Sequence, residues 1–202
     1  DNTERAQSPE HSNTDRAPRR AEEEGADNAF PSASDDEVGG FQRAIRAERA
    51  QRAEQSNKTA LVTGASSGIG EATALQLSEL GYTVYAAARR VERMSDLADR
   101  GIRTTSVDVT DDPSMVALLQ TIIADTGRID VLVNNAGYGL YGALEDTPIE
   151  EARRQFEVNL FGLARLTQLV LPHMRSQRDG YIVNISSMGG KIWEPLGSWY
   201  HA

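Results

Sequence analysis

The stretch Thr63-Gly64-Ala65-Ser66-Ser67-Gly68-Ile69-Gly70 decides the fold of this chain. It follows a short β-rich run and opens an amphipathic segment that continues to Leu80. Gly64 permits a tight turn, Gly68 lets a pyrophosphate approach the backbone, and Gly70 lets the helix pack closely on the strand. The phosphates would then lie on free N–H groups at the positive end of a helix. The stretch predicts a dinucleotide site, although three glycines alone also suit an ordinary strand-to-helix turn.

Beyond this turn, β-rich runs alternate with segments of helical period, which is typical of a parallel sheet built from βαβ units. Several runs lack polar alternation, as expected for strands that are covered on both faces. We therefore predict an α/β domain over residues 58–202, with a Rossmann-type doubly wound parallel sheet. Its five strands are expected at residues 59–63, 82–88, 102–107, 131–134 and 181–186.

Two helices have recognisable ends. Asp112 before Pro113 predicts an N-cap, and Gly127 predicts the end of the same helix. Thr147 and Glu150 have the spacing of a capping box and predict the start of a long helix. Its sheet-facing residues are expected to be Phe156, Leu160, Leu163, Leu166, Val170 and Leu171. A second apolar stripe, formed by Val158, Phe161 and Leu169, is available to pack against another subunit.

The first 57 residues differ from the rest of the chain. They contain thirteen acidic residues and eight arginines but few large apolar side chains. Such a composition cannot bury enough apolar surface to offset the conformational entropy lost on folding. We predict an acidic, Arg-rich arm over residues 1–57, disordered over 1–40, with a frayed helix over 41–55. Recruitment of a partner by this arm is an alternative interpretation.

Charge and composition exclude several classes of protein. The net charge of −9 is spread along the chain, which argues against nucleic acid as a partner. No apolar run approaches the roughly 20 residues that span a bilayer, so we expect no membrane span and a cytoplasmic protein. The chain has no cysteine, and its histidines are not spaced with acidic residues as metal ligands, so we assign no metal.

The end of the second predicted strand points to the cofactor. An acidic residue there would bind the ribose 2′-hydroxyl of NAD, whereas arginine accommodates the 2′-phosphate of NADP. Ala88 occupies the expected acidic position, and Arg89 and Arg90 follow it. The charge therefore favours NADP over NAD. The alternative is a solvated turn beside Glu92.

A second motif, Asn134-Asn135-Ala136-Gly137, ends the fourth predicted strand. With both motifs in this order, residues 58–202 resemble the short-chain dehydrogenase/reductase family. The resemblance implies a homo-oligomer for the full-length form. It also implies a set of cofactor-binding residues, namely Gly64, Ser66, Ser67, Gly68, Ile69, Gly70, Arg89, Arg90, Asp108, Val109, Asn135, Ala136 and Gly137. Asp108 is alternatively a cap or turn residue.

The resemblance also implies a catalytic set. Tyr200 would be the acid in reduction and the base in oxidation, Ser187 would hydrogen-bond the carbonyl oxygen, and Asn159 would hold a water in the proton relay. Tyr200 is expected to begin a helix directly after the loop that follows the strand ending near Ser187. The substrate would be an alcohol or carbonyl compound.

Tyrosine in water has a pKa of about 10, so a catalytic tyrosine needs a nearby cation. In the family this is a lysine four residues after the tyrosine, but the sequence ends at Ala202, and Lys191 is interpreted as a surface charge. We therefore expect a C-terminally truncated fragment that lacks the last helices and strands. Its bare apolar sheet edge would make it poorly soluble and inactive. The alternative function is that of a non-catalytic dinucleotide-binding module.

Large apolar side chains surround the predicted catalytic residues in the sequence. They would suit a bulky, apolar substrate, although core packing explains them equally well. The residues are Tyr138, Leu140, Tyr141, Met188, Trp193, Leu196 and Trp199.

Overall fold

The computed structural model describes residues 40, 43–44, 46–48, 50 and 57–202. The predicted disorder of residues 1–40 lies outside this part of the chain, apart from Gly40. Within the predicted frayed helix at 41–55, residues 43–44, 46–48 and 50 are helical, and the remaining residues lie outside the described ones.

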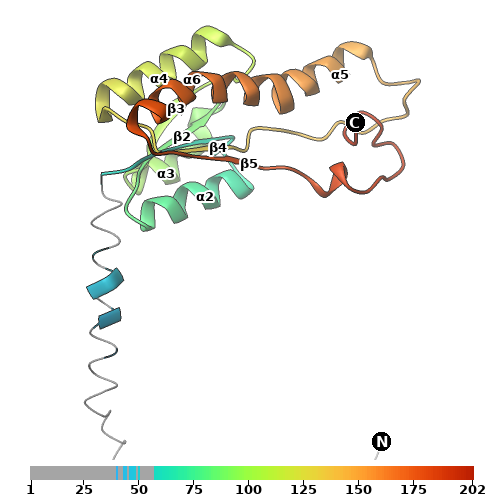
Figure 1. Cartoon of the computed structure of the whole chain (residues 1–202). Coiled ribbons are helices and arrows are strands. Elements are labelled where there is room, and N and C mark those ends of the chain that lie inside the picture. Colours follow the sequence, from blue (N-terminus) through green and yellow to red (C-terminus); the bar gives the residue numbers. More distant parts are fainter. Residues whose placement is uncertain (1–39, 41–42, 45, 49, 51–56) are drawn as a thin grey trace, which may run out of the picture. The chain divides into compact units, whose positions relative to one another are not determined.

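Five parallel strands form one sheet in the order β3-β2-β1-β4-β5 (Figure 1). Strand β1 pairs with β2 on one side and with β4 on the other. The strand order therefore reverses between β1 and β4, which confirms the doubly wound fold and places the ligand crevice at the carboxyl ends of these strands. The bounds are β1 Thr59–Thr63, β2 Thr83–Ala88, β3 Arg103–Ser106, β4 Val131–Asn134 and β5 Tyr181–Asn184.

Helices cover both faces of the sheet (Figure 1). On one face α2 and α3 pack over Ala60 and Val62 of β1, and on the other α4 and α6 pack over Leu61. Because successive side chains of a strand point to opposite faces, β1 is buried on both sides. The helical elements are α2 Gly68–Glu79, η1 Val91–Met94, α3 Ser95–Asp99, α4 Asp112–Thr126, α5 Ile149–Phe156, η2 Glu157–Gly162, α6 Leu163–Gln177 and η3 Met188–Gly190.

The predicted strand bounds are correct within two residues, with one consequence for the site. Strand β5 ends at Asn184, because the last ladder bond runs from Ile185 N to Asn134 O (2.9 Å). Ser187 therefore lies in the connection after the strand and not at its end. Strand β5 is an edge of the sheet, and Tyr181 and Val183 are 64% and 44% exposed, in keeping with the expected apolar edge.

The predicted helix caps are partly wrong. Asp111, not Asp112, is the N-cap of α4, since its backbone is extended and its side chain accepts a hydrogen bond from Ser114 N (3.2 Å). Asp112 instead pairs with Arg165 across to α6 (2.5 Å). Gly127 ends α4 with a φ of 70°, as predicted.

The capping box at Thr147 is also wrong. Helix α5 begins at Ile149 without a side-chain cap, and Thr147 Oγ1 donates to Ala143 O (2.9 Å) in the preceding turn. The N-cap residue is Pro148, which has no side-chain acceptor for the free N–H groups of the helix.

The buried face of the long helical segment differs from the prediction because η2 is a π-helix between α5 and α6. Its wider turns add a residue, which rotates the apolar pattern. Leu160 is consequently 50% exposed, whereas Val158, predicted to face another subunit, is buried. The face that does pack inward consists of Ala152, Gln155, Val158, Gly162, Leu166, Val170 and Met174.

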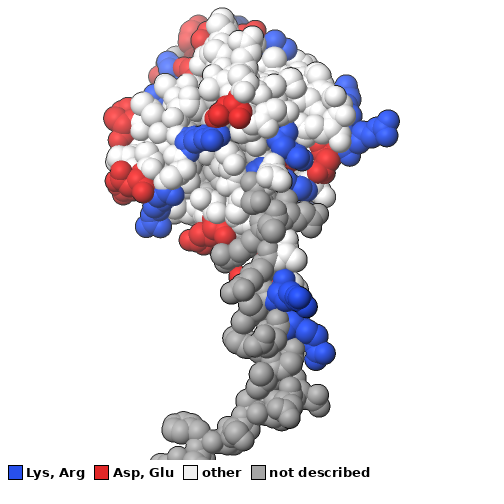
Figure 2. All heavy atoms as spheres, turned by 90° about the vertical axis from the view of Figure 1, so that its left-hand side faces the viewer, with Lys and Arg blue, Asp and Glu red and all other residues white. Residues whose placement is uncertain are grey.

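One face of the surface carries acidic and basic side chains interspersed over the folded part (Figure 2). That face offers no continuous positive area of the kind that binds a nucleic-acid backbone. Of the helices in the described ranges, none is long and apolar enough to cross a membrane.

Candidate functional site

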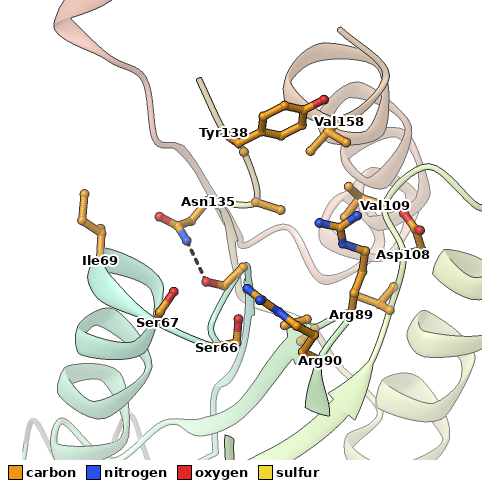
Figure 3. A pocket seen from close by; sticks show the side chains of 16 residues that line it. Ser66, Ser67, Ile69, Arg89, Arg90, Asp108, Val109, Asn135, Tyr138 and Val158 are labelled. Atoms are coloured by element: carbon orange, nitrogen blue, oxygen red, sulfur yellow. Dashed lines mark hydrogen bonds between the residues drawn. The ribbon is translucent and has the colours of Figure 1, made fainter. Parts of the chain in front are cut away.

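A cavity of about 380 Å³ lies where strands β1, β2 and β4 and the loop after β3 come together (Figure 3). Most of the predicted cofactor-binding residues line it, namely Gly64, Ser66, Ser67, Ile69, Arg89, Arg90, Asp108, Val109, Asn135, Ala136 and Gly137. Five lining residues were not in the predicted set, and these are Ala87, Ala88, Val107, Tyr138 and Val158. Ala87, Ala88 and Val107 could have been found from topology, because parallel strands all point their carboxyl ends at this edge.

The three glycines of the first turn differ in their surroundings. Gly64 has a φ of 65°, and a methyl group added there would lie 2.8 Å from Ala136 Cα. Gly70 does not line the cavity. A methyl group there would lie 2.5 Å from Gly64 O, so the glycine allows α2 to pack closely on the turn. Gly68 has a φ of 60° and open space around it, and it does not line the cavity either.

The two sequence motifs are hydrogen-bonded to each other. Asn135 Nδ2 donates to Thr63 O (3.1 Å) and Gly64 O (3.2 Å), and Figure 3 shows this side chain reaching the turn. Thr63 Oγ1 in return accepts from the backbone N–H groups of Asn135 and Ala136, both at 3.1 Å. These hydrogen bonds therefore hold the turn after β1 and the loop after β4, which form two walls of the cavity, against each other. Thr63 was not predicted as a site residue, and the only signal was a hydroxyl at the end of a buried strand.

The end of strand β2 is positively charged. Arg89 and Arg90 are exposed and line the cavity, with the Arg90 side chain extending toward Ser66 (Figure 3). Glu92 does not line the cavity, and neither arginine forms an ion pair with a described acidic residue. The exposure of both arginines agrees with a cofactor contact and also with the alternative of a solvated turn beside Glu92.

Asp108 is both a cavity residue and a turn residue. Its Oδ1 accepts from Thr110 N (2.9 Å) and Thr110 Oγ1 (2.8 Å). Partial burial raises the pKa of the Asp108 carboxyl, but these hydrogen bonds and the charges of Arg89 and Arg154 outweigh burial and lower the pKa overall. Asp108 therefore places a negative charge at the edge of the cavity at neutral pH.

Asn159 lies in the π-helix η2 and holds the loop that follows β4. Its Oδ1 accepts from Tyr138 N (3.1 Å), and its Nδ2 donates to Tyr138 O (2.8 Å). The loop is close enough that a methyl group added at Gly137 would lie 3.2 Å from Asn159 Oδ1. Both ends of this side chain are thus engaged with backbone, and the predicted contact with a relay water remains a prediction.

Ser187 and Tyr200 both lie beside Gly189. A methyl group added at Gly189 would lie 3.1 Å from Tyr200 Cε1 and 3.3 Å from Ser187 Oγ. Ser187 Oγ accepts from Gly189 N (3.0 Å), which leaves its own proton free for donation. Tyr200 also lies close to the loop after β4. A methyl group added at Gly139 of this loop would lie 3.6 Å from Tyr200 Cγ.

Tyr200 lies in a turn, and the helix predicted to begin there remains a prediction. Gly197 O accepts from Tyr200 N (3.0 Å) and His201 N (2.9 Å), which forms a single turn.

Three polar residues that were not predicted lie near Tyr200, namely Glu194, His201 and Gln155. Tyr141 donates to Glu194 Oε1 (2.9 Å), and this hydrogen bond raises the pKa of the Tyr141 phenol. The rings of Tyr141 and Tyr200 lie 5.6 Å apart. His201 Nδ1 lies 2.7 Å from Gly189 O. The third residue, Gln155, joins the segments on either side of the site and could not be identified from the helical pattern alone.

Most of the apolar residues near these groups are exposed. Core packing therefore does not account for them, and they are available to contact a substrate or another part of the protein. The exposed ones are Tyr138, Tyr141, Met188, Trp193 and Leu196, while Leu140 and Trp199 are half-buried. Lys191 is exposed, as predicted.

Comparison with known proteins adds to this geometry. A family described as short chain dehydrogenase matches residues 58–202. The chain is 44% identical to a 3-ketodihydrosphingosine reductase of Bacteroides thetaiotaomicron over 142 residues, covering 70% of this chain and 51% of the relative. It is also 44% identical to a solved short-chain dehydrogenase from Streptomyces avermitilis, covering 71% of this chain and 54% of that one, with a TM-score of 0.69.

A third similar protein is an actinorhodin polyketide ketoreductase solved with NADPH, at 36% identity and a TM-score of 0.69, covering 73% of this chain and 59% of that one. Other similar structures contain NAD⁺ or NADH. The chain spans about half the length of the curated relatives it matches.

Proposed function

Since the chain belongs to the short-chain dehydrogenase/reductase family, we propose that it forms part of an NADP(H)-dependent oxidoreductase that interconverts an alcohol and a carbonyl compound. One observation carries the choice of cofactor. Strand β2 ends at Ala88, and two arginines follow it into the cavity. Arginine binds phosphate through paired hydrogen bonds, and Ala88 stands at the strand end where a carboxylate would bind the ribose hydroxyl of NAD.

The residues of the cavity fit a dinucleotide. Outside the cavity lining, the open space at Gly68, the first residue of α2, suits a pyrophosphate. Arg89 and Arg90 would hold the 2′-phosphate, Asp108 the adenine, and Asn135 with Gly137 the nicotinamide half. The nicotinamide supplies hydride transfer when it is bound.

The chain's own groups handle the substrate. Tyr200 exchanges the proton of the alcohol oxygen, and Ser187 donates a hydrogen bond to the same oxygen. Asn159 fixes the cofactor-side loop through Tyr138 and holds the relay water. The exposed apolar side chains near Tyr200 suit a bulky, apolar substrate. The full-length form of the protein is proposed to be a homo-oligomer.

We expect Arg89→Ala to weaken NADPH binding about tenfold and to leave NADH binding unchanged. A charge-assisted hydrogen bond is worth roughly 1.5–3 kcal/mol, and only NADPH has the 2′-phosphate that accepts it. Calorimetric titration of the chain with each cofactor measures both constants. Arg100→Ala is the matched control, because Arg100 is exposed at the end of α3 and outside the cavity.

An equal loss for both cofactors, or tighter binding of NADH by the unchanged chain, would contradict the assignment to NADP. The reaction itself is tested by following NADPH oxidation with a panel of apolar ketones in the longest natural form of the protein. Binding without turnover would favour a dinucleotide-binding module.

A further inference from the structure

Helix α5 carries a buried amide that joins the two loops on either side of the proposed site. Gln155 is only 3% exposed, and both ends of its side chain are engaged. Its Oε1 accepts from Leu140 N (2.6 Å), and its Nε2 donates to Trp199 O (2.7 Å). Leu140 belongs to the loop after β4, and Trp199 directly precedes Tyr200.

We infer that Gln155 is a positioning residue, which sets the distance between the segment that carries Tyr200 and the loop that borders the cofactor cavity. This inference rests on the proposed role of Tyr200. A neutral amide is the group that suits this place, because it offers one acceptor for the N–H and a donor for the carbonyl.

The pattern on the helix supports a bridging role. Asn159 lies four residues after Gln155 and binds Tyr138 through both of its amide ends. The two amides therefore attach successive parts of one loop to α5 and η2. Of these two amides, Gln155 also bonds to the segment that carries Tyr200. A backbone hydrogen bond from Gly142 N to Leu196 O (2.8 Å) joins the same two loops.

The position of Tyr200 depends on this attachment. Its ring packs against Gly139 of one loop and Gly189 of the other, so the ring moves if the loops separate. Proton transfer requires approach to hydrogen-bond distance, and a displacement of about 1 Å can reduce turnover by roughly 10²-fold. Breaking the bond to Trp199 O would also leave a partly buried carbonyl without this donor.

The test uses Trp199 as a reporter. The chain has two tryptophans, so Trp193→Phe leaves Trp199 as the only one. Trp199 is half-buried, and its Nε1 is buried, so its emission shifts to the red when the segment detaches. In this background, Gln155→Glu retains the acceptor for Leu140 N but places a carboxylate against Trp199 O.

We expect the emission of the Gln155→Glu variant to be red-shifted at neutral pH and to return to the parent value on acidification. Protonation of the glutamate restores a donor for Trp199 O, and burial raises the pKa of such a carboxyl above its usual value of about 4.3. A residue that only stabilised the fold would give no pH-reversible shift. Circular dichroism and NADPH titration should stay close to those of the parent chain.

Gln168→Glu makes the same change at an exposed position of α6 and should leave the emission unchanged at every pH. If the Gln155→Glu variant does not fold, Gln155→Met decides, since it fills the same volume without either bond and should give a red shift that does not vary with pH. Parent-like emission in a folded Gln155 variant at neutral pH would overturn the inference. Because emission needs neither cofactor nor turnover, this result is separate from a failure of the parent chain to bind NADPH.

Discussion

Gly64→Ala is expected to destabilise the chain by about 3 to 4 kcal/mol and to abolish measurable cofactor binding. A left-handed backbone costs an alanine roughly 1–2 kcal/mol, and overpacking adds about 1–3 kcal/mol. Both apply here, since the φ is 65° and the added methyl group would lie 2.8 Å from Ala136 Cα and 2.9 Å from Ala136 N. These are backbone atoms, which cannot rotate away. Urea denaturation followed by circular dichroism measures the change in unfolding free energy.

Gly68→Ala is the matched control, because Gly68 has nearly the same φ, 60°, and no neighbour within 4 Å. It should lose only the backbone term, about 1 to 2 kcal/mol. We nevertheless expect it to weaken NADPH binding by at least about tenfold, since its methyl group would occupy space proposed for the pyrophosphate. Equal destabilisation by the two variants would show that crowding at Gly64 is not the cause. Unchanged NADPH affinity of Gly68→Ala would place the phosphates elsewhere.

The sequence was sufficient for the parts of this structure that depend on local rules. The left-handed turn at Gly64 follows from what glycine alone tolerates, and the five strands follow from β-rich runs separated by helical segments. Parallel strands all end at one edge of the sheet, so motifs that are far apart in sequence were correctly placed together. This is why most of the predicted cofactor-binding residues line one cavity.

Features that depend on long-range contacts were missed. The π-helix η2 adds a residue to its turn and so rotates the buried face of the helical segment. The spacing of apolar residues in the sequence does not predict this extra residue. Gly162 faces Val109 O at a distance that excludes a side chain, so the close approach of η2 to the loop after β3 is consistent with a glycine there. Gln155 bonds to Trp199 across 44 residues, and a lone glutamine in an amphipathic helix gives no sign of such a partner.

Tyr200→Phe is expected to reduce turnover by roughly 10²- to 10⁴-fold in the longest natural form of the protein, which is the usual contribution of a general acid or base. The change removes one oxygen from a ring that packs against Gly139 and Gly189, so the fold should be retained. Cofactor affinity should also be retained, because Tyr200 does not line the cavity. Stopped-flow or steady-state measurement of NADPH oxidation gives the rate, and calorimetry gives the affinity.

Tyr141→Phe is the decisive comparison, because it removes the neighbouring phenol, whose ring lies 5.6 Å from that of Tyr200. The Tyr141 proton is already donated to Glu194, and the resulting rise in the pKa of Tyr141 makes this phenol harder to ionise. Tyr141 is therefore a poor proton donor, and its replacement should reduce turnover far less. If Tyr141→Phe removed activity while Tyr200→Phe retained it, the acid would be Tyr141, and the exposed pair of Tyr141 with Glu194 would become the centre of the reaction.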